Sequence, residues 1–141
     1  MALQLNPYLT FSGQAKEAME FYADVLGGTL NVMTFRDAGT DIDGIMHAAL
    51  ETPTGFHLYA SDQFEGMGPD LVHGNNIQIS LSGDEADALR GFWSRLADGG
   101  QVVMPLERQM WGDDYGLVTD KFGISWHVNL HLQELPSIAA Q

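Results

Sequence analysis

The feature that most constrains this chain is an internal repeat. Three dipeptides recur, and their offset grows one position at a time, as small insertions would cause: Ser12-Gly13 with Ser82-Gly83, Phe21-Tyr22 with Phe92-Trp93, and Gly27-Gly28 with Gly99-Gly100. Self-similarity of this kind indicates one supersecondary unit present twice. The 141 residues therefore predict a single domain of two modules. We place module one at about 1–62, a connector at 63–73, module two at about 74–131 and a tail at 132–141.

Each half begins with the same two predicted elements. A strand, Asn6–Phe11 or Asn76–Leu81, precedes the Ser-Gly pair, and a helix follows it. The helices are predicted because apolar residues spaced three and four apart form one buried stripe. The stripes are Ala15, Ala18, Met19, Tyr22, Val25 and Leu26 in the first half, and Ala86, Leu89, Trp93 and Leu96 in the second. Ser82 with Glu85 predicts a capping box, and the Gly-Gly pairs suit left-handed backbone at the helix ends.

Three more strands complete each half. The predicted ranges are Thr29–Phe35, Ile45–Glu51 and Phe56–Ser61, then Gln101–Leu106, Tyr115–Thr119 and Ile124–Leu130. The order βαβββ, present twice, predicts an α+β fold.

Alternation along four of these strands predicts two chemically different sheet faces. Along Ile124–Leu130, the apolar Trp126 and Val128 alternate with His127 and Asn129. The same pattern puts other polar side chains on one face: Asn6, Tyr8 and Thr10; His57, Tyr59 and Ser61; Asn76, Gln78 and Ser80. We interpret these faces, which hold no Asp or Glu, as the lining of a sheltered polar pocket. A solvated sheet surface is the alternative.

The charge balance excludes several classes of partner. Nineteen acidic and six basic residues give a net charge of −13, whereas nucleic acids and anionic membranes are bound through a basic footprint. We expect the acidic residues, Asp62 and Asp113 among them, on turns and outer helix positions. The absence of cysteine excludes disulfides and thiolate metal sites. The N-terminal MALQLNPYLTF does not resemble a signal peptide and no long apolar run is present, so we predict a cytoplasmic protein.

Three segments carry a resemblance to a known family: PYLTFSGQAKEAMEFY at 7–22, MHAAL at 46–50 and WGDDYGLVTDKFGISWHVN at 111–129. With them the chain resembles the vicinal oxygen chelate superfamily of glyoxalases, bleomycin-resistance proteins and dioxygenases, and within it the PhnB-like group. The resemblance implies two βαβββ modules that curl around a shared cavity. It also implies a homodimer.

The resemblance further implies where a metal would bind. Family-typical sites use His, Gln or Glu from the first and last strands of both modules, which correspond here to Asn6, Tyr59, Asn76 and His127. Of these only His127 is a good ligand for a transition metal, whereas catalytic sites use about three protein ligands. We therefore expect no cofactor, with a divalent metal as the alternative.

The favoured function is binding of a small molecule in the polar cavity. Trp111 and Tyr115 are expected near its mouth, where they could stack on a planar ligand. The full set of predicted ligand-binding residues is Asn6, Tyr8, His47, His57, Tyr59, Asn76, Gln78, Trp111, Tyr115 and Asn129. One alternative is a lyase, isomerase or dioxygenase-type enzyme that uses His127 as base or metal ligand; another is a protein-interaction module with a vestigial cavity. His73 and His131 are assigned no role.

Overall fold

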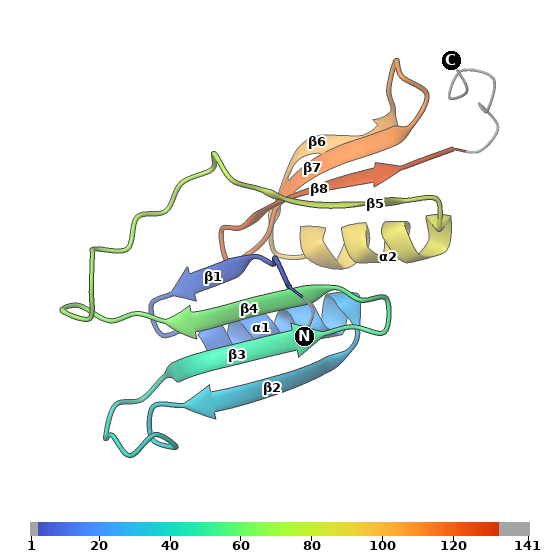
Figure 1. Cartoon of the computed structure of the whole chain (residues 1–141). Helices are drawn as coiled ribbons and strands as arrows, with labels where there is room; N and C mark the ends of the chain where they lie inside the picture. Colours follow the sequence, from blue (N-terminus) through green and yellow to red (C-terminus); the bar gives the residue numbers. More distant parts are fainter. Residues whose placement is uncertain (1–2, 133–141) are drawn as a thin grey trace. The chain divides into compact units, whose positions relative to one another are not determined.

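The computed structural model of the chain describes residues 3–132, so all of the predicted tail at 132–141 except its first residue lies outside the described residues. The chain forms two compact units, Met1–Val72 and His73–Gln141. Each unit contains one helix and one four-stranded sheet in the order βαβββ (Figure 1). The predicted α+β fold of two βαβββ modules is confirmed.

Unit 1 consists of β1 (Tyr8–Phe11), α1 (Ala15–Leu26), β2 (Thr29–Thr34), β3 (Ile45–Glu51) and β4 (His57–Asp62). The strand order is β1-β4-β3-β2, with β1 parallel to β4 and the other pairs antiparallel. Helix α1 covers one face of this sheet and buries most of the predicted apolar stripe: Ala15, Ala18, Met19, Tyr22 and Val25. Burial of a side chain as large as Met19 contributes roughly 1.5–3 kcal/mol.

Unit 2 repeats this topology with β5 (Ile79–Gly83), α2 (Ala86–Ala97), β6 (Gln101–Arg108), β7 (Asp114–Thr119) and β8 (Ser125–Leu130). Its strand order is β5-β8-β7-β6, with β5 parallel to β8. Of the predicted stripe on α2, only Leu89 and Leu96 are fully buried. Trp93 is half-buried and packs against Gly116 of β7, where a Cβ atom would lie 2.6 Å from the indole.

The alternation predicted for the closing strands is confirmed. In β8, Trp126, Val128 and Leu130 are buried, while Ser125, His127 and Asn129 are partly accessible. In β4, Leu58 and Ala60 are buried and alternate with His57, Tyr59 and Ser61. We call the sheet face opposite the helix the open face of each unit.

Several predictions at the strand starts are wrong. β5 begins at Ile79, so Asn76 and Ile77 precede it, and Ile77 is 87% exposed instead of buried. The physical reason is the sequence Gly74-Asn75-Asn76, since Gly and Asn favour turns and bends over strands. Likewise β1 begins after Asn6.

The predicted capping box is also wrong. Ser82 lies inside β5, and α2 begins after Glu85, whose side chain makes no capping hydrogen bond. Of the helix-end glycines, Gly27, Gly28 and Gly99 have the predicted positive φ, whereas Gly100 does not.

Two buried aspartates accept backbone hydrogen bonds at the starts of α1 and β3 and in the turn before β8. Asp62, expected on the outside, is 3% exposed and accepts backbone N–H bonds from Ala15 and Ile45, both at 2.9 Å. Asp120 is equally buried and holds the turn before β8. Buried carboxylates are tolerated when hydrogen bonds satisfy them.

Among residues 3–132, no helix is long and apolar enough to span a membrane.

Candidate functional site

The open face of unit 2 carries two connected groups of polar side chains. β8 and β7 are antiparallel neighbours, with Tyr115 opposite Asn129 and Leu117 opposite His127. Because side chains alternate along a strand, His127, Asn129 and the following His131 point to one face. Tyr115 lies on the same face and packs against His127, with ring centroids 5.6 Å apart and nearly parallel planes.

His127 lies at the centre of the first group. Its Nε2 is hydrogen-bonded to Oε1 of Gln78, and its Nδ1 lies 2.5 Å from the hydroxyl of Tyr115. An amide oxygen only accepts hydrogen bonds, so Nε2 carries the proton and the bare Nδ1 accepts from Tyr115. Both ring nitrogens are therefore engaged. The phenol oxygen of Tyr115 keeps its lone pairs available for another donor.

The second group joins Trp111 to His131. The indole N–H of Trp111 donates to Oδ1 of Asn129 at 3.4 Å, and Nδ2 of Asn129 donates to Asp113 at 2.8 Å. His131 Nδ1 lies 3.1 Å from the other oxygen of Asp113. Trp111 is 51% exposed, and its ring lies 5.7 Å from that of Tyr115, which brings the two groups together.

The Asp113 carboxyl is held in its ionised form. The hydrogen bond from Asn129 is the largest cause that lowers its pKa, and bonds from His131 and the backbone of Leu132 add to this. Partial burial acts in the opposite direction but is outweighed. Asp113 was expected on the outside of the fold. The structure instead makes it part of the open face.

The open face of unit 1 brings together four predicted residues. The hydroxyl of Tyr8 lies 3.2 Å from Nδ1 of His47, and the ring of Tyr59 meets both edge-on. Gln4 links Tyr59 to Asn6, since its amide lies 2.9 Å from the Tyr59 hydroxyl and 2.8 Å from Asn6 Oδ1. Sequence reasoning missed Gln4, because it precedes β1 and has no periodic pattern around it.

His57 lies two residues along β4 from Tyr59 but has a different neighbour. Its Nδ1 is 3.7 Å from a carboxylate oxygen of Glu51, too far for a hydrogen bond. This atom is buried and has no hydrogen-bond partner among residues 3–132. Glu51, at the end of β3, therefore brings an acid to a face on which none was predicted.

Asn76, like His57, is a predicted residue that the structure does not bring into these hydrogen-bonded groups. It is exposed, it precedes β5, and within the described part of the chain no hydrogen bond joins its side chain to His127 or Gln78. The predicted neighbour Gln78 does reach His127.

Known proteins share both the sequence pattern and the fold. Residues 4–128 match the sequence profile of the Glyoxalase/Bleomycin resistance protein/Dioxygenase superfamily. The chain belongs to this superfamily. The resemblance found in the sequence is thereby confirmed.

The alignments of this superfamily member with individual relatives cover nearly the whole chain. The uncharacterized protein Rv0887c of Mycobacterium tuberculosis is 32% identical over 137 residues, covering 93% of this chain and 76% of that protein. The crystal structure of protein PA1353 from Pseudomonas aeruginosa has a TM-score of 0.80 at 38% identity, covering 92% of this chain and 98% of that one. A PhnB protein from Bacillus cereus has a TM-score of 0.75 at 20% identity, covering 92% and 100%, and shows the fold alone.

The family-typical metal positions of this superfamily member do not fit a transition metal. In unit 1, Asn6 and Tyr59 are neutral oxygen donors already tied to Gln4. In unit 2, Asn76 is exposed ahead of β5 and both nitrogens of His127 are engaged. Among residues 3–132, no group of three or more His, Cys, Asp or Glu side chains could hold a metal ion. The donor chemistry at these positions is thus poor for a divalent metal.

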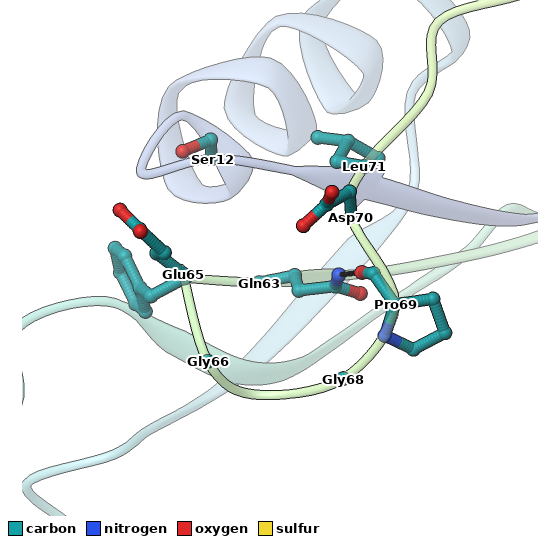
Figure 2. A pocket seen from close by; sticks show the side chains of 9 residues that line it. Ser12, Gln63, Glu65, Gly66, Gly68, Pro69, Asp70 and Leu71 are labelled. Carbon is teal, nitrogen blue, oxygen red and sulfur yellow. Dashed lines mark hydrogen bonds between the residues drawn. The ribbon is translucent and has the colours of Figure 1, made fainter.

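A separate cavity of about 280 Å³ lies in the loop that follows β4 (Figure 2). It is lined by Ser12, Gln63, Phe64, Glu65, Gly66, Gly68, Pro69, Asp70 and Leu71. The amide of Gln63 donates to the carbonyl of Pro69 across it. None of the predicted site residues lines this cavity, which adjoins the end of β1 opposite to Tyr8.

Proposed function

We propose that this superfamily member binds a small, uncharged organic molecule against the open face of unit 2. The observation that supports this most is the hydrogen-bonded chain Tyr115–His127–Gln78. Its bonds orient the groups before a ligand arrives, and preorganised groups bind with a smaller entropic cost.

The accessible side chains on this face suit a ligand with one flat face and one or two polar atoms. The Tyr115 oxygen is an acceptor, and the amide group of Gln78, which is bonded to the other nitrogen of His127, offers N–H donors. Trp111 is fixed by its bond to Asn129 and leaves an indole face half exposed. Binding pockets commonly combine aromatic surface with a few placed polar groups.

Recognition in this proposal uses hydrogen bonds and ring contacts, and it needs no resident metal. The neutral donors at Asn6 and Tyr59, and the engaged nitrogens of His127, support that part of the proposal. Stoichiometric zinc, iron, manganese or nickel in protein purified without chelator, lost in His127→Ala, would contradict it.

The test is a screen of small aromatic and heteroaromatic compounds by native mass spectrometry, followed by calorimetry. A ligand of the open face should bind Tyr115→Phe about 2–10-fold more weakly, since one hydrogen bond is worth about 0.5–1.5 kcal/mol. Glu20→Gln, on the exposed side of α1, is the control and should bind like the wild type. Unchanged affinity in Tyr115→Phe, or silence across the screen, would refute the proposal.

An enzymatic role is a second candidate, and one contact favours it. The hydroxyl of Tyr115 donates to a bare imidazole nitrogen, so the phenol proton has an acceptor in place. In such a reaction Tyr115 would act on the substrate as general base, and His127 would hold the proton. Turnover that persists without added metal and disappears in both Tyr115→Phe and His127→Gln would support this candidate.

We also propose that the chain assembles into a homodimer and is located in the cytoplasm. Light scattering on the purified chain tests the first, and a monomer at micromolar concentration would refute it. Cell fractionation tests the second.

A further inference from the structure

The two histidines on the open face of unit 2 differ in whether a ring nitrogen is available to a ligand. His127 has both nitrogens engaged, by Tyr115 and Gln78. His131 contacts Asp113 through Nδ1, and its Nε2 has no hydrogen-bond partner within the described part of the chain. Its side chain is 50% exposed. The available imidazole nitrogen is therefore at His131, a residue to which the sequence assigned no role.

The tautomer of His131 follows from its partner. Asp113 accepts a bond from Asn129 at 2.8 Å and another from His131, so its oxygens act as acceptors only. The lowered pKa of Asp113 agrees with an ionised carboxylate. Because a carboxylate cannot donate, Nδ1 of His131 carries the proton and Nε2 is bare in the neutral ring.

We infer that His131, oriented by Asp113, accepts the hydroxyl proton of a phenol-type ligand bound at the open face. The inference rests on the proposed function and names the class of ligand. Trp111 and Tyr115 supply adjoining ring surfaces for the aromatic part, and Trp111 is joined to His131 through Asn129 and Asp113.

Charge on this face argues against an ionic ligand. The two nearby arginines, Arg90 and Arg108, are paired with Asp114, at 2.6 Å and 3.3 Å. Asp114 is the neighbour of Asp113 and points to the opposite, helix-covered face. A ligand that is already a carboxylate would meet the negative Asp113, with which no Lys or Arg among residues 3–132 forms an ion pair. A neutral hydroxyl matches the bare Nε2.

The step involves one proton and no change of oxidation state. The ligand O–H bond breaks and an Nε2–H bond forms. The ligand leaves the step as a phenolate, and His131 becomes an imidazolium whose Nδ1–H still donates to the Asp113 carboxylate. The negative Asp113 carboxylate stabilises the positive charge on the His131 imidazolium, which is the usual role of a carboxylate beside an imidazole.

The experiment uses para-nitrophenol, whose phenolate is yellow, and its methyl ether para-nitroanisole, which has no hydroxyl proton. Both are titrated into the full chain at a pH below the pKa of the free phenol. We expect para-nitrophenol to bind with growth of the phenolate band, and the ether to bind at least about ten-fold more weakly, since hydrogen bonds to charged groups are worth about 1.5–3 kcal/mol.

Two variants separate the base from the rest of the site. His131→Asn keeps an N–H donor for Asp113 but removes the basic nitrogen, so the phenolate band should vanish and affinity should fall about ten-fold. Asp113→Asn keeps the imidazole and should reduce the band. Long-range nitrogen–proton NMR of the wild type should show the Nε2–H tautomer at His127 and the Nδ1–H tautomer at His131.

Three results would overturn the inference: equal binding of phenol and ether, an unchanged phenolate band in His131→Asn, or an Nε2–H tautomer at His131. If para-nitrophenol does not bind while the screen finds another ligand that depends on Tyr115, the inference fails and the proposed function stands. If no compound in the screen binds, the proposed function itself fails.

Discussion

Replacing Asp120 tests how the turn before β8 holds His127 in place. The buried carboxylate accepts three bonds: from the backbone N–H of Phe122 at 2.8 Å, from that of Ile124 at 3.1 Å, and from the indole of Trp126 at 2.9 Å. One oxygen serves both backbone groups and the other serves the indole. Asp120 is therefore the anchor between the turn and the core.

The expected loss of folding stability follows from these three donors. Asp120→Asn keeps one acceptor oxygen and turns an amide N–H toward the remaining donor, so at least one bond to a charged acceptor is lost. That loss is worth about 1.5–3 kcal/mol. Asp120→Ala leaves all three donors buried without a partner and should cost at least about 3 kcal/mol, because each unsatisfied donor costs about 1–3 kcal/mol.

The assay is equilibrium unfolding in urea, followed by circular dichroism. Asp41→Asn is the matched control, since Asp41 is exposed, and it should change the free energy of unfolding by less than about 0.5 kcal/mol. The expected order of stability is wild type and Asp41→Asn, then Asp120→Asn, then Asp120→Ala. A midpoint for Asp120→Asn that matches the control would refute the role given to the carboxylate.

Two further predictions concern packing and titration. Gly116→Ala places a methyl group against Trp93, with 2.6 Å from the new Cβ to the indole, and should destabilise the chain by about 1–3 kcal/mol in thermal unfolding; an unchanged Tm would mean that Trp93 moves freely. Asn129→Leu removes the main cause of the lowered Asp113 pKa, which should rise in a carboxyl NMR titration. The stability that Asp113 contributes is present above its unfolded pKa of about 3.9 and is lost as the pH falls through the lower folded value. An Asp113 pKa that Asn129→Leu leaves unchanged would contradict this.

Much of the fold could be predicted from local patterns. β3 was predicted with the bounds that it has, Ile45–Glu51, and α1 begins and ends with its apolar stripe. The pattern of α1 is periodic along the whole helix, and periodicity directly reports which side is buried. At β5 the pattern misled, because Ile77 continues the alternation although Asn75 and Asn76 keep the backbone out of the sheet.

The candidate site was only partly predictable, for a different reason. His127 stands out because polar residues alternate with apolar ones along its strand, whereas Tyr115 was expected near the mouth of the cavity. Asp113 and His131 lie 18 positions apart and come together only through the pairing of β7 with β8. In the sequence, Asp113 has no feature that distinguishes it from a solvated aspartate. Such contacts depend on strand register, which single-sequence patterns leave open.

Binding of a small molecule to the open face of unit 2 is tested most directly by NMR of the histidine side chains during titration. The titrant is the tightest compound from the screen, or para-nitrophenol. We expect the imidazole signals of His127 and His131 to shift together in proportion to occupancy, while the amide signals of Gln63 and Leu71 at the loop cavity stay in place. Shifts confined to the loop cavity, with both imidazoles unmoved, would contradict it.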